Sequence, residues 1–163
     1  MNAVITRRLA LLALVATAPL ALLGAAPKPQ PGTIAGVYRA NGKDAKLTHM
    51  LLVHADDFSG QKTVTLVMTE KDASKDDQPD VGAMFGKYGS ALIVGVQPDG
   101  GVISCQIAHT ALEHPGVSSV GRLKTKNFKW ANGQVSGKLT TEGKATVFDE
   151  TWEADLDFSG KLP

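Results

Sequence analysis

The chain of 163 residues contains a single cysteine, Cys105. One thiol cannot form an internal disulfide, so the fold has to be stabilised by its hydrophobic core. Aromatic residues make up only 6% of the chain. We therefore expect a core built mainly from Val, Leu, Ile and Ala. The length is enough for one modest domain with one core.

The sequence also lacks a surplus of either charge. It has 17 basic and 16 acidic residues, and removing Arg7 and Arg8 from the basic ones would leave 15. A balanced charge provides no overall attraction to nucleic acid or to an anionic membrane. We therefore expect no nucleic-acid partner.

The N-terminus contains the one long apolar segment that we interpret as a targeting signal. Residues 9–26 are apolar and follow Arg7 and Arg8. A basic start, an apolar stretch and small residues at its end are typical of a secretory signal peptide, which we place at 1–26. The protein is therefore predicted to be exported, either to the periplasm or into the medium.

The alternative is an N-terminal anchor that stays attached, because the apolar segment approaches the roughly 20 residues of a spanning helix. Pro19 and the Pro-rich residues 27–32 favour cleavage, which would leave no membrane span. Cutting after Ala26 fits the small-x-small pattern but places Pro27 next to the cut, whereas cutting after Ala25 avoids this proline. We assign 27–32 to a linker and 33–163 to a single β domain.

Alternating apolar and polar residues recur through the predicted domain, and helical periodicity is scarce. An antiparallel sandwich or small barrel of about eight strands is therefore expected. At most one short helix is expected, near 79–88, with Asp76, Asp77 or Asp80 as its N-cap. The predicted strands are 33–40, 45–55, 61–70, 90–96, 102–110, 119–130, 134–142 and 150–158.

Cys105 and two histidines suggest a metal site, but strand geometry argues against a local one. On a strand, Cys105 and His109 share a face yet lie roughly 13 Å apart, while zinc holds its ligands at about 2.0–2.3 Å. Ile103 and Ile107 on that same face indicate a core instead. A site assembled from His49, Cys105 and His109 requires that 45–55 lie beside 102–110. Metal binding through these residues is therefore an alternative hypothesis.

Catalytic patterns are missing from the sequence. It contains no G-x-S-x-G, S-x-x-K or H-E-x-x-H motif. The apolar neighbours of Cys105 do not suit a nucleophile, which needs a base and an electropositive setting. A small hydrolase is therefore the weakest of three hypotheses.

The segment "RLKTKNFKW" at 122–130 is the most unusual stretch. Alternation would place three cations and two aromatic residues on one strand face, namely Arg122, Lys124, Lys126, Phe128 and Trp130. Cations attract an anionic ligand, and aromatic rings stack on a sugar or a base. The alternative is that Phe128 and Trp130 lie in the core and the cations continue across a bulge. In that case the acidic residues of 150–158 could pair with the cations.

Several stretches resemble small exported bacterial all-β proteins without an assigned activity. They are "YRANGK", "LTHMLLVHA", "LVMTEKD" and the ending "VFDETWEADLDFSGKLP". The resemblance implies an exported all-β domain and transfers no functional residue. Our first hypothesis is a non-enzymatic exported domain that binds an envelope protein or an anionic or carbohydrate ligand, through the segment 122–130.

Overall fold

The computed structural model describes residues 28–56 and 60–162, with the backbone alone at 54–56. The predicted signal peptide, 1–26, lies outside these residues. The elements follow in the order β1 (Gln30–Ala40), β2 (Lys43–Ala45), β3 (His49–Asp56), β4 (Lys62–Thr69), α1 (Pro79–Met84), β5 (Ala91–Val96), β6 (Val102–Ala108), β7 (Val117–Ser118), β8 (Lys124–Ala131), β9 (Gln134–Thr140), β10 (Ala145–Val147) and β11 (Glu150–Lys161). The predicted all-β fold with one short helix is confirmed. Within the residues that the structure describes, no helix is long and apolar enough to cross a membrane.

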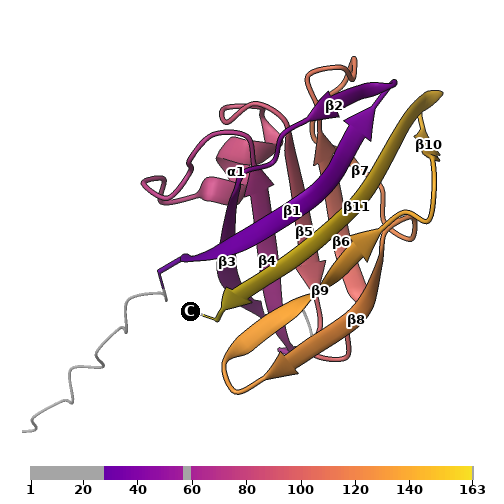
Figure 1. Ribbon diagram of the computed structural model, residues 1–163. Coiled ribbons are helices and arrows are strands. Elements are labelled where there is room, and N and C mark those ends of the chain that lie inside the picture. The colour runs from indigo at the N-terminus through magenta and orange to yellow at the C-terminus, as the bar shows by residue number, and fades with distance from the viewer. Residues whose placement is uncertain (1–27, 57–59, 163) are drawn as a thin grey trace, which may run out of the picture.

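The strands form one antiparallel sheet in the order β7-β6-β5-β4-β3-β1-β11-β9-β8, with β2 added beside β1 and β10 beside β11. The order ends at β7 and β8, which do not pair with each other over the described residues, so the sheet is not closed into a barrel. Figure 1 shows β1, β11, β9 and β8 crossing in front of β3 to β7. The sheet therefore folds over itself into two layers, as in a sandwich.

The strand β1 connects the two layers. Its first residues, Gln30 to Gly32, pair with β3, and the rest of its length pairs with β11. The sequence assigned 30–32 to a linker, and this was wrong because these residues are already hydrogen-bonded into the sheet. Gly36 has a φ of 136°, and a Cβ there would come within 2.1 Å of the Asp155 carbonyl oxygen. Only glycine fits this crossing of β1 over β11.

The main core lies between the two layers. The last strand, β11, contributes Trp152, Ala154, Leu156 and Phe158 to it, all at most 4% exposed. These four residues alternate with polar ones along the sequence, as expected of a strand with one buried face. Each large apolar side chain buried here contributes about 1.5–3 kcal/mol. A smaller core lies under α1 on the other face of β3 to β6, so β3 and β5 are apolar on both faces. The helix contributes Ala83 to this second core.

Two predicted strands have other bounds in the structure. The segment predicted at 45–55 is split into β2 and β3 by residues 46–48. The segment predicted at 119–130 is a strand only from Lys124, as β8, and the short β7 lies just before its predicted start. The short β10 was not predicted. The helix α1 has Gln78 at its N-cap, without a side-chain cap. Asp76 instead accepts hydrogen bonds from Tyr88 Oη and Lys87 Nζ, at 2.5 and 2.9 Å, so the prediction of an aspartate cap was wrong.

Three two-residue turns join neighbouring antiparallel strands, and both central residues of each turn have a positive φ. Asn41–Gly42 and Asn132–Gly133 use the residues that tolerate this geometry best. The third turn, between β10 and β11, uses Phe148 and Asp149, with φ values of 45° and 64°. The Phe148 ring is 74% exposed. The Phe148 side chain itself therefore does little to compensate the strained backbone at this turn.

Replacing Phe148–Asp149 by Asn-Gly is expected to raise the free energy of unfolding by about 1 kcal/mol, because it relieves left-handed backbone strain. Urea unfolding measures this change. The matched control is the reverse exchange, Asn132→Phe with Gly133→Asp, which is expected to lower stability by a similar amount. A stabilising effect of the Phe148 ring would be indicated if the first exchange lowered stability.

Candidate functional site

The outer face of β1, β11, β9 and β8 is covered by charged side chains. Alternate residues of β11 point into the core, so the residues between them point outward. We call this surface the charged face; it comprises Arg39, Lys124, Lys126, Lys138, Glu142, Glu153, Asp155 and Asp157.

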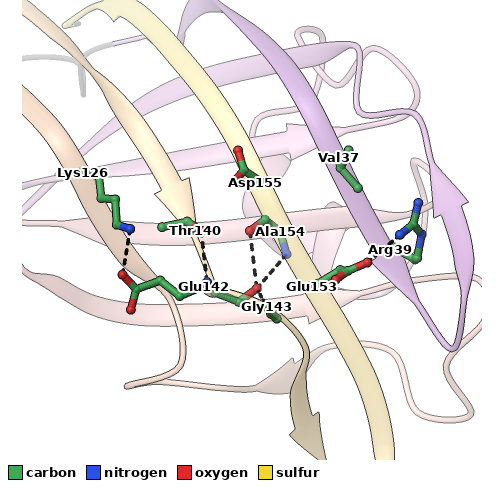
Figure 2. A pocket seen from close by; sticks show the side chains of 10 residues that line it. Val37, Arg39, Lys126, Thr140, Glu142, Gly143, Glu153, Ala154 and Asp155 are labelled. Atoms are coloured by element: carbon green, nitrogen blue, oxygen red, sulfur yellow. Dashed lines mark hydrogen bonds and ion pairs between the residues drawn. The ribbon is translucent and has the colours of Figure 1, made fainter.

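A hollow of about 610 Å³ lies on this face, where the chain after β9 diverges from β11. The regular pairing of β9 with β11 ends at Thr140. Beyond it, Thr141 Oγ1 takes the place of a backbone acceptor and accepts a hydrogen bond from the backbone N–H of Ala154 at 3.1 Å. Figure 2 shows Lys126 joined to Glu142 on one side of the hollow and Arg39 joined to Glu153 on the other. The hollow is therefore bordered by ion pairs on both sides.

The ion pairs hold each charged group in place without burying it. Arg39 contacts Asp44 at 2.5 Å and Glu153 at 2.6 Å. Glu142 contacts Lys124 and Lys126, each at 2.8 Å. These two lysines lower the pKa of Glu142 to about 2. The carboxylate is therefore charged at every physiological pH.

The structure separates the cations of the segment 122–130 from its aromatic residues. Pairing between β8 and β9 shifts between Lys126 and Lys129, and Asn127 has a φ of 51° within this bulge. The bulge moves Phe128 and Trp130 to the inner face, where they pack against the main core. The prediction that all five residues share one face was therefore wrong, and the bulge that we considered as an alternative is present.

The remaining residues of the segment lie apart from the hollow. Arg122 precedes β8 and is exposed. Our alternative interpretation paired the acidic residues of β11 with the cations of β8, but Lys138 of β9 contacts Asp155 and Asp157 instead. Sequence reasoning missed Glu142 and Lys138, because the pairing of β9 with both β8 and β11 is not visible in their local sequence.

The strand order separates the proposed metal ligands. The strand β3, with His49, lies three positions from β6, with Cys105, because β4 and β5 are between them. Three strand spacings amount to roughly 14 Å. Among the residues that the structure describes, no group of three His, Cys, Asp or Glu side chains is close enough to hold a metal ion. His49, Cys105 and His109 thus do not come together in one site.

Cys105 lies in the main core and is fully buried. The prediction that Ile103 flanks it on the core face was wrong, because a shift in the pairing of β5 and β6 leaves Ile103 39% exposed. Burial raises the pKa of the Cys105 thiol to about 12. The side chain therefore behaves as a small apolar group and not as a nucleophile.

His109 is 3% exposed and packs edge-on against the Tyr38 ring, with 5.2 Å between ring centroids. Its Nδ1 accepts a hydrogen bond from the backbone N–H of Ala111 at 3.0 Å. Burial lowers the pKa of His109, and the opposing effect of the Glu70 and Asp44 charges is smaller. The neutral imidazole therefore holds the start of the 109–116 loop.

Cys105 is expected to resist a thiol reagent such as Ellman's reagent in the folded protein at pH 8, and to react fully in urea. Burial and a pKa of about 12 keep the thiolate population very small. Absorbance of the released thiolate reports the reaction. Rapid labelling of the folded protein would contradict the core position of this side chain.

The protein is expected to lose stability as the pH falls below about 6.5, because unfolding releases His109 to its ordinary pKa and the unfolded chain then binds the proton first. Above that pH both states hold a neutral imidazole, and the full contribution of the buried ring is present. Urea unfolding at pH 7.5 and pH 5.5 measures the loss.

His109→Asn is the matched variant, because its Oδ1 can accept the same N–H bond from residue 111 without titrating. The variant is expected to show a smaller drop in stability between the two pH values than the wild-type protein. An equal drop in both proteins would show that other groups cause the acid sensitivity.

No family model, curated protein or solved structure matches the chain. The function therefore has to be inferred from the arrangement of the side chains. Two features remain for this purpose, namely the charged face with its hollow and the loops around the 109–116 segment.

Proposed function

We propose that the protein is an exported, non-enzymatic binding domain that uses the charged face to bind an envelope partner. The observation that carries the proposal is the hollow of about 610 Å³ on the outer face of β1, β11, β9 and β8. An ion pair borders this hollow on each side. A sheet surface is rigid, so the charged groups are already in position before a partner arrives.

The ion pairs favour a partner that carries charges of both signs. A polyanion would have to displace Glu142 and Glu153 from the cations, and a polycation would have to displace Lys138 from Asp155. A segment with neighbouring acidic and basic groups can exchange these pairs one for one. Exposed pairs contribute only about 0–1 kcal/mol each, so the exchange costs little.

A carbohydrate ligand is less favoured by this surface. Stacking on a sugar needs an exposed ring, and the two aromatic side chains of β8 pack against the core instead. We therefore propose an extended polypeptide segment of mixed charge as the partner. Such segments are bound through complementary charges, and the complex weakens as salt is added.

A peptide of alternating Glu and Lys is expected to shift the amide NMR signals of β8, β9 and β11 around the hollow. Lys124→Glu combined with Lys126→Glu is expected to abolish these shifts, because both partners of Glu142 are reversed. Lys129→Glu is the matched control, since Lys129 is an exposed residue of the same strand that does not line the hollow.

Three further ligands separate the alternatives in the same titration, namely a Glu-only peptide, a Lys-only peptide and chitotriose. Stronger shifts with the mixed-charge peptide than with these three support the proposal. Equal shifts with the Glu-only peptide would identify a general anion site, and shifts with chitotriose alone would identify a sugar site. Either result would contradict a mixed-charge partner.

A further inference from the structure

The turn between β10 and β11 presents an aromatic ring to solvent at a cost in backbone strain. The other two turns of this kind use Asn-Gly, whereas this one holds Phe148 at a φ of 45° with the ring 74% exposed. Strain of this type persists where the surrounding structure imposes it, and it accumulates at functional positions. The ring is therefore available for a contact outside the fold.

The surrounding structure does hold this turn in place. Asn41 exchanges two hydrogen bonds with the backbone of Thr151, at 2.8 and 3.0 Å. Its side-chain amide also donates to Glu150 Oε1 at 3.1 Å, and the same oxygen accepts the backbone N–H of Glu113 at 2.9 Å. The Phe148 turn is thus attached both to the β1–β2 turn and to the 109–116 loop. Figure 1 shows the β1–β2 and β10–β11 turns at the same end of the molecule.

A hollow of about 300 Å³ lies beside this loop, between it and the C-terminal end of α1. Two glycines, Gly86 and Gly89, form one side, and Ala108, Leu112 and Pro115 contribute apolar surface. An apolar cavity of about 150 Å³ is enough to hold a benzene molecule. The hollow can therefore accept one phenyl ring.

We propose that two copies of this chain associate about a two-fold axis, with the Phe148 ring of each copy inserted in the hollow of the other. A ring and a hollow on the same end of one chain form a self-complementary surface, as a two-fold dimer requires. Charge supports the match, because Asp149 adjoins the ring and Lys87 adjoins Gly86. Lys87 remains 61% exposed although it pairs with Asp76.

The charges around the ring favour a protein surface over a lipid one. Asp149, Glu150 and Glu113 lie near Phe148 along the bonded network. An anionic membrane would repel this end of the molecule. A second copy offers both an apolar hollow and a lysine next to it, so it is the occupant that these residues fit best.

Sedimentation equilibrium over micromolar to millimolar concentrations tests the proposal. The protein without the predicted signal peptide is expected to dimerise, and Phe148→Asn is expected to weaken dimerisation at least about tenfold. Asparagine tolerates the left-handed backbone, so urea unfolding should show no loss of stability at a protein concentration low enough for the wild type to be monomeric. Val120→Asn is the matched control, because Val120 is an exposed apolar residue elsewhere in the chain, and it should dimerise as the wild type does.

Thr110→Arg tests the hollow, since Thr110 lines it and is exposed. This variant should also be monomeric, while its own Phe148 ring is intact. An equimolar mixture of Phe148→Asn and Thr110→Arg should recover part of the association, because one ring and one hollow still fit together.

Three results would overturn the proposal. They are a wild-type protein that stays monomeric over the whole range, variants that dimerise as well as the wild type, and a mixture that shows no recovery. The experiment does not involve the charged face, so its outcome is independent of the function proposed for that surface.

Discussion

The hydrogen bonding of β1 to both layers is the constraint on which the rest of the structure depends. Its first residues pair with β3 and its remaining length pairs with β11, so a single sheet continues from one layer into the other. The inner faces of the layers then meet in one core, which needs no disulfide. A side chain at Gly36 would collide with the β11 backbone, and the two layers could not stay in register.

The charged face follows from this arrangement. Because β11 buries every second side chain, Glu153, Asp155 and Asp157 must point outward, and their cationic partners come from β1 and β9. The bulge in β8 then decides what the edge of this face presents. It keeps Lys124 and Lys126 outside and moves the aromatic residues to the core, so the face is ionic and has no stacking platform.

The loops at one end of the layers form a second, separate surface. Here the hydrogen bonds of Asn41 and Glu150 join three segments that are distant in the sequence. None of these three segments predicts the network by itself, because each bond depends on which strands are neighbours. The charged face was predictable in part, since the lysines of β8 and the acidic residues of β11 were visible as alternating patterns, whereas the pairing of Glu142 was not.

The sequence by itself determined the all-β class, the strand faces of β11 and two of the tight turns, because period-two alternation and Asn-Gly pairs act over a few neighbouring residues. Only the tertiary structure decided the strand order and the bulges in β6 and β8. Each bulge reverses the faces of the residues that follow it, and its position is set by the pairing with another strand. For the same reason His49 and Cys105, which could have been neighbours, are separated by two strands.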